Sequence, residues 1–80
     1  MKYRAKVYVT LKEGVLDPQG NAVAQGLKSM GYAVGEVRVG RYIELEVEAD
    51  GEEIARGKID EMCRRLLANP VIEDYTFALS

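Results

Sequence analysis

The sequence contains no histidine, no tryptophan and a single cysteine among its 80 residues. One cysteine cannot form a disulfide within the chain, and the cysteine and histidine clusters that usually bind zinc are missing. Histidine is also the commonest general base, so a catalytic pair of nucleophile and histidine is excluded. We therefore expect neither a covalent cross-link nor a bound metal in this chain.

Long apolar runs are also lacking. The first twelve residues alternate apolar with charged or polar side chains, which fits neither a signal peptide nor a membrane-spanning helix. We therefore expect no membrane partner and a cytoplasmic location. The formal net charge of −2 gives no basic surface of the kind that binds nucleic acid, so no nucleic-acid partner is expected.

A chain of 80 residues is long enough for one domain, which we assign to residues 1–80, and too short for two. Domains of this size bury a thin core, and many gain stability by binding to copies of themselves. Because disulfides and metal sites are not expected, we predict a homo-oligomer, either a dimer or a tetramer.

The spacing of apolar residues predicts six elements in the order strand, helix, strand, strand, helix, strand, at residues 2–12, 18–30, 33–39, 42–49, 52–68 and 71–79. The order βαββαβ is that of a ferredoxin-like α+β sandwich, in which one antiparallel sheet carries both helices on one face. In this topology the first and third strands are neighbours. Their outward faces are rich in lysine and arginine on one strand and in glutamate on the other, and such opposite charges stabilise the pairing.

Local signals mark the ends of the predicted helices. Asp17 immediately before Pro18 predicts an N-cap followed by proline at the first helical position. Asp50, with Glu53 three residues later, predicts a capping box for the second helix. Gly31 is a natural residue to end the first helix.

Most residues that could take part in catalysis have a structural explanation. Cys63 lies on the apolar side of the second helix, together with Ala55, Ile59, Met62 and Leu66. We therefore interpret Cys63 as a core residue and not as a nucleophile. The three glutamates at positions 44, 46 and 48 are interpreted as ion-paired partners of the basic strand.

Two binding sites are weighed and set aside. Residues 13–20 precede a helix N-terminus, which often binds anions, but Asp17 places a negative charge there and the spacing matches no phosphate-binding fingerprint. Tyr8 and Tyr42 occupy the outward strand faces on which RNA-recognition motifs stack bases. The three glutamates on the same face would repel a phosphate backbone.

Five residues are predicted to contact other subunits. Val15 and Leu16 form an apolar pair in the loop before the first helix, outside its apolar stripe. Arg38, Arg41 and Tyr42 lie in a segment predicted to form the tip of a hairpin, and arginine and tyrosine are enriched among interface anchors.

Three segments resemble the PurS family, the small subunits of phosphoribosylformylglycinamidine synthase. Residues 9–20, followed by Ala22 and Val23, resemble the N-terminal signature of that family. Residues 36–42 resemble its hairpin, and residues 63–75 resemble its second helix and last strand. The resemblance covers essentially the whole chain, with arginine at position 41 where lysine is expected and methionine at position 30 where leucine is usual.

The resemblance implies a function in purine biosynthesis. A PurS-like chain is expected to be a non-catalytic subunit that bridges a glutaminase subunit and a large ATP-dependent synthetase subunit. It is expected to help ammonia pass from the first to the second. The complex is expected to use ATP and magnesium, and this chain is expected to bind no cofactor.

Two other classes of function remain open at this point. One is a stand-alone dimeric regulatory domain that binds a small molecule, which a ligand that raises the melting temperature of the isolated protein would reveal. The other is an RNA-binding module, which salt-dependent binding to single-stranded RNA would reveal.

We predict that the purified chain alone neither hydrolyses ATP nor releases ammonia from glutamine, because it lacks a nucleophile–base pair and a phosphate-binding loop. Coupled assays for phosphate and ammonia test this. Turnover by the isolated chain that persists in Cys63→Ala would contradict it.

Overall fold

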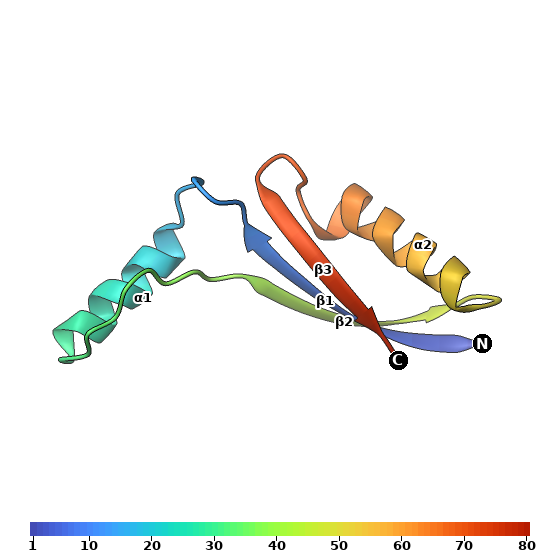
Figure 1. The fold of residues 1–80 in the computed structure, drawn as a ribbon, viewed down its shortest axis with the longest axis horizontal. Coiled ribbons are helices and arrows are strands. Elements are labelled where there is room, and N and C mark those ends of the chain that lie inside the picture. Colours follow the sequence, from blue (N-terminus) through green and yellow to red (C-terminus); the bar gives the residue numbers. More distant parts are fainter.

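The computed structural model describes all 80 residues and confirms the predicted α+β class. Figure 1 shows the elements in chain order: β1 (Lys2–Leu11), α1 (Pro18–Ser29), β2 (Arg41–Glu48), α2 (Glu52–Met62), the π-helical turn η1 (Cys63–Leu67) and β3 (Glu73–Leu79).

The sheet is antiparallel, with strand order β2-β1-β3. The alternation in the central strand β1 places Ala5, Val7 and Val9 on the inner face, where all three are buried. The register aligns Val7 with Ile43 on β2 and with Phe77 on β3. The inner faces of the three strands therefore form one apolar layer.

The outer face of the sheet holds the predicted charge pairs. Lys2 Nζ lies 3.6 Å from a carboxylate oxygen of Glu46, and Arg4 Nη1 lies 4.0 Å from one of Glu44. All four side chains are about half exposed or more, so each pair contributes at most about 1 kcal/mol. A shift by one residue would turn the glutamates toward the apolar face, so the pattern also specifies the register.

Helix α2 covers the inner face of the sheet. Ala55, Ile59 and Cys63 are fully buried in the core, which confirms the structural interpretation of Cys63. Burial raises the pKa of its thiol, and the Asp60 carboxylate adds to the effect, so the sulfur stays protonated near neutral pH.

The end of this helix differs from the prediction. In η1 the Ala68 N–H donates to the Cys63 carbonyl, five residues earlier, at 2.9 Å. This wider turn rotates the residues after Cys63, so Leu67 packs against the core. Leu66, which was predicted on the inward face, is 84% exposed.

The start of α2 also differs from the prediction. The N-cap residue is Gly51, with φ 143°, and no side chain caps the helix. Asp50 was predicted as the cap, but the turn at Gly51 leaves it one residue outside the helix. Glu52 and Glu53 in the first turn instead face the positive end of the helix dipole.

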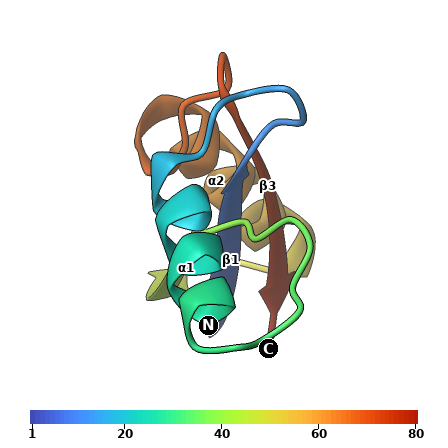
Figure 2. The ribbon, with the colours of Figure 1, turned by 90° about the vertical axis from the view of Figure 1, so that its left-hand side faces the viewer.

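The ferredoxin-like order of the paired strands is confirmed, but the strand predicted at 33–39 is absent. Those residues form neither strand nor helix, so the predicted hairpin does not form and β2 keeps one unpaired edge. Helix α1 lies beyond the end of the sheet instead of beside α2, and residues 32–40 run back along it (Figures 1 and 2). A hydrogen bond from the Val39 N–H to Asp17, at 2.9 Å, holds this return segment against the start of α1.

We call residues 18–40 the arm, and the rest of the chain the body. The arm makes the molecule elongated, with extents of 51 × 24 × 14 Å and a radius of gyration of 16.0 Å. A compact domain of the same length would have a radius of gyration of about 12 Å. The single chain is therefore much less compact than a typical domain of its length.

The junction of arm and body requires a residue without a side chain. A Cβ added at Gly40 would collide with the carbonyl oxygen of Val9, whereas one added at Gly35 would meet nothing. Gly40→Ala should therefore lower the free energy of unfolding by about 1–3 kcal/mol. Gly35→Ala is the matched control and should leave it within about 0.5 kcal/mol.

Urea unfolding of both variants measures the difference. Equal stabilities would show that the chain crosses the end of β1 less closely than the structure has it.

Candidate functional site

The loop predicted to form an interface links β1 to α1. Gly14 adopts φ +82°, in the left-handed region that favours glycine, and the Val15 N–H donates to the Lys12 carbonyl at 3.2 Å. The turn leaves Val15 half-buried and Leu16 72% exposed. An apolar side chain is therefore presented to solvent by an ordered turn.

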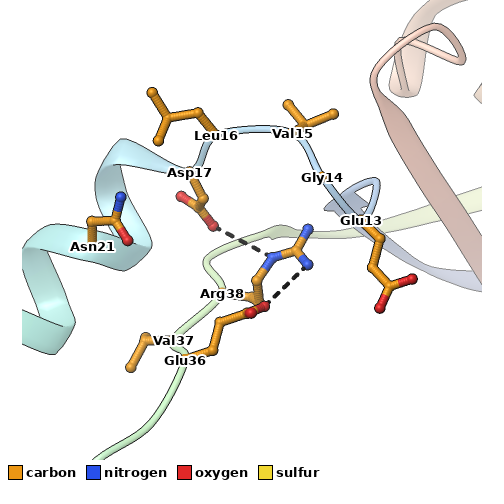
Figure 3. Close-up of a pocket in the computed structure, with 9 residues that line it drawn as sticks. All are labelled: Glu13, Gly14, Val15, Leu16, Asp17, Asn21, Glu36, Val37 and Arg38. Carbon is orange, nitrogen blue, oxygen red and sulfur yellow. Dashed lines mark hydrogen bonds and ion pairs between the residues drawn. The ribbon is translucent and has the colours of Figure 1, made fainter.

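A hollow of about 510 Å³ opens between this loop, the start of α1 and the return segment of the arm. Figure 3 shows its lining, which consists of Glu13, Gly14, Val15, Leu16, Asp17, Asn21, Glu36, Val37 and Arg38. Three of these residues are carboxylates and one is a guanidinium. The hollow is thus acidic in net charge.

Asp17 is the buried centre of this site. Its Oδ1 accepts a hydrogen bond from the Gly20 N–H at 2.8 Å, which confirms the predicted N-cap, and its Oδ2 accepts one from the Val39 N–H at 2.9 Å. The Val39 N–H lowers the pKa of this carboxyl most strongly. The Gly20 N–H and the Arg38 guanidinium lower it further, against the opposing effect of burial. Asp17 therefore joins helix, loop and return segment through its charged form.

Arg38 reinforces the same junction from the return segment. Its Nη2 donates to the Leu11 carbonyl and, at 3.2 Å, to the Lys12 carbonyl, both at the end of β1. Its Nη1 lies 3.4 Å from Glu36, and its buried Nε lies 3.9 Å from Asp17 Oδ2 without a hydrogen bond. Most of the donors of this guanidinium are therefore engaged within the chain.

Arg41 has a second set of partners on the body. Its guanidinium makes a bidentate pair with Glu73, at 2.9 and 3.1 Å, and donates to the Leu67 carbonyl at 2.6 Å. Glu73 also accepts a hydrogen bond from the Asn69 N–H at 2.7 Å. The Arg41 side chain lowers the pKa of Glu73 most, followed by the Asn69 N–H. Arg41 is still half exposed, so its outer edge is open to solvent.

Tyr42 lies elsewhere, on the outer face of the sheet. Its ring is 5.1 Å from that of Tyr8, centroid to centroid, and the planes are tilted by 39°. Both rings are about half exposed. Burial, followed by the Glu44 carboxylate, raises the pKa of the Tyr42 hydroxyl.

The structure thus brings together only part of the predicted interface set. Val15, Leu16 and Arg38 line one hollow, while Arg41 and Tyr42 lie outside it. The partners of both arginines escaped the sequence reasoning, because Leu11 and Glu73 are 27 and 32 residues away from them. Nothing in the local sequence around Glu73 signals that role.

No group of side chains in the chain is arranged to hold a metal ion. Neither helix has the length and apolar character needed to cross a bilayer. The polar groups around Asp17 are bonded to backbone groups of the chain itself. These polar groups therefore hold one segment of the chain against another.

Fold and site together define a small ferredoxin-like α+β chain with a protruding arm and an exposed apolar loop. Residues 4–80 match the family model described as PurS, phosphoribosylformylglycinamidine (FGAM) synthase. The chain belongs to the PurS family, as the resemblance implied.

Curated relatives and a solved structure agree with this assignment. The PurS subunit of phosphoribosylformylglycinamidine synthase from Synechocystis is 51% identical over 98% of this chain and 79% of its own length. That of Bacillus subtilis is 53% identical over 94% of this chain and 89% of its own length. A chain in the structure of PurLQS from Thermotoga maritima superposes with a TM-score of 0.91 at 32% identity, covering 100% of this chain and 99% of that one.

Asp17→Asn should flatten the loss of stability in acid. Because the pKa of Asp17 is lower in the folded chain than in the unfolded chain, the unfolded state takes up the proton first as the pH falls. The stability supplied by the carboxylate is full above about pH 5 and disappears as the pH falls through the folded-state pKa. The variant should therefore be less stable than the wild type near neutral pH, and the gap should close in acid.

Urea midpoints between about pH 7 and 2.5 measure this gap. Asp50→Asn, at an exposed carboxylate for which no hydrogen bond is found, is the control and should follow the wild type. A gap between wild type and Asp17→Asn that stays constant with pH would disprove the role of the charged form.

Proposed function

We propose that this chain serves as the non-catalytic small subunit of an FGAM synthase complex in purine biosynthesis. It joins the glutaminase subunit to the large ATP-dependent synthetase subunit and helps ammonia pass between them. The observation that supports this is the match along the whole chain, arm included, to a chain solved within PurLQS. The match therefore covers the arm as well as the body.

ATP and magnesium belong to the complex in this proposal, and this chain binds neither. Most polar groups of Asp17 and Arg38 already have partners within the chain, which fits a scaffold better than a nucleotide site. The same proposal places the subunit in the cytoplasm with the rest of the complex.

Five residues supply contacts to other subunits in this proposal. Leu16 and, in part, Val15 offer apolar surface on an ordered turn, and Tyr42 offers an exposed ring. Arg38 keeps the loop and the arm in place, and Arg41, which is half exposed, contributes the outer edge of its guanidinium. Exposed apolar and aromatic groups beside ordered arginines are typical of interface anchors.

Self-association is part of the same proposal. The unpaired edge of β2 is eight residues long, and such an edge pairs readily with another chain. A core of nine buried apolar residues is small for a domain that must be stable alone. The chain is therefore proposed to form a dimer or a tetramer.

Reconstitution from purified subunits tests the bridging function. Glutamine-dependent formation of the amidine should require all three subunits. Activity with added ammonium salt should need only the synthetase subunit, because free ammonia bypasses the transfer step. Glutamine-dependent activity that persists when this chain is omitted would contradict the proposal.

Leu16→Ala should weaken binding of this chain to the other two subunits on the order of tenfold, because it removes exposed apolar surface from the contact. Its melting temperature should stay near that of the wild type, since Leu16 lies outside the core. Ile54→Ala, at another exposed apolar residue, on α2, is the matched control and should bind normally. Binding of Leu16→Ala equal to that of the control would remove Leu16 from the interface.

A further inference from the structure

Two loops leave the sheet at the same end. Strand β1 ends at Leu11 and β3 begins at Glu73, and these two residues are partners in the antiparallel register. The Lys12 N–H continues the pairing by donating to the Ile72 carbonyl at 2.9 Å. The loop after β1 and the loop before β3 therefore start side by side, and Figures 1 and 2 show both loops beyond this end of the sheet.

Aliphatic side chains gather on these two loops. Val71 is 81% exposed, Leu16 is 72% exposed and Ile72 is 40% exposed, while Val15 is half-buried. We call these four residues the end patch. None of them packs against the core, and none lines the apolar groove of about 570 Å³ between β2 and α2. The end patch is therefore an apolar surface of its own.

The loop before β3 is fixed by the backbone and the side chain of Asn69. The Asn69 carbonyl accepts hydrogen bonds from the Ile72 N–H at 3.1 Å and from the Glu73 N–H at 2.7 Å. Its side-chain oxygen accepts one from the Val71 N–H, also at 3.1 Å. Val71 is thus held outward in a defined position, as Leu16 is by the turn in the other loop. A partner that binds here has neither loop to order, which favours tight binding.

Acidic side chains border the end patch. Figure 3 shows the side chains of Val15 and Leu16 on one side of the loop after β1, and the carboxylates of Glu13 and Glu36 on the other side. No ion pair or side-chain hydrogen bond is found for Glu13 within the chain, and Glu36 is 76% exposed. An apolar centre with a charged rim is the usual arrangement of a protein interface.

A second copy of this chain does not complement the end patch. A symmetric contact between the same patch on two copies must be self-complementary. Here it would set protruding loops against protruding loops and bring the carboxylates of Glu13 and Glu36 toward their equals on the other copy. The hollow beside the loop is a poor site for an aliphatic side chain, because three carboxylates and one guanidinium line it. The patch therefore fits a different protein.

We propose that the end patch docks into an apolar depression on another subunit of the complex, and that lysine or arginine side chains border this depression. Leu16 and Val71 enter the depression, and the basic side chains of the partner face Glu13 and Glu36. The proposal rests on the function proposed above, which supplies the partner. It adds Val71, Ile72 and Glu13 to the contact surface and states the chemistry of the surface that they meet.

Two substitutions test the apolar centre and the acidic rim separately. Val71→Ser removes an exposed aliphatic side chain, and Glu13→Lys reverses an exposed charge, so both variants should fold. Ile54→Ser on α2 and Asp50→Lys before α2 are the matched controls, because they make similar changes at exposed residues away from the end patch. Binding of each variant to the glutaminase subunit and to the synthetase subunit is measured separately, together with its melting temperature.

Each test variant should bind one of the two subunits on the order of tenfold more weakly than the wild type does, with a nearly unchanged melting temperature. The controls should bind normally. Added salt should weaken binding of the wild type and strengthen that of Glu13→Lys, because salt screens an attraction in the first case and a repulsion in the second. A variant that only disturbed the fold would not reverse the salt dependence.

The outcomes separate this proposal from the function on which it rests. A wild type that binds neither subunit overturns both. A wild type that binds a subunit, with both test variants binding equally well, overturns the docking surface alone. An effect of only one test variant overturns the half of the proposal that the other variant tests. Test variants that bind both subunits normally but change the mass of the isolated chain in light scattering would assign the patch to a second copy and overturn the proposal.

Discussion

The shape of this molecule depends on the carboxylate of Asp17. This one side chain accepts hydrogen bonds from the Gly20 N–H in α1 and from the Val39 N–H in the return segment. The first bond is an ordinary helix cap, and the second links it to a residue 22 positions away. Arg38 adds bonds to the end of β1. The arm is therefore a fixed part of the molecule and not a loose end.

The consequence of a fixed arm is a fold divided into two incomplete parts. The body has a sheet with a free edge and a groove beside α2, and the arm has a nearly uncharged helix and an extended segment. Each part exposes apolar surface that a stable small domain would bury. A free strand edge and exposed apolar surface are typical of a chain that works as a subunit of a larger assembly.

The features predicted from the sequence are those set by short-range patterns. Alternation predicted the three strands of the sheet, and Asp17 before Pro18 predicted the start of α1, because these signals act between residues close in sequence. The charge pairs followed from the predicted order of the strands. The capping box at Asp50, the inward position of Leu66 and the strand at 33–39 were wrong. The turn at Gly51 leaves Asp50 outside the helix, and the π-helical turn directs Leu66 outward. Contacts with residues remote in sequence hold residues 33–39 away from the sheet.

The same division holds for the candidate site. The exposure of Leu16 followed from its place outside the helical stripe, whereas the pairing of Arg41 with Glu73 depends on how the ends of two distant strands meet. The bond between Asp17 and the Val39 N–H is tested most directly by amide hydrogen exchange followed by NMR. The Val39 amide should be protected in the wild type and lose its protection in Asp17→Ala. A Val39 amide that exchanges equally fast in both proteins would contradict the account.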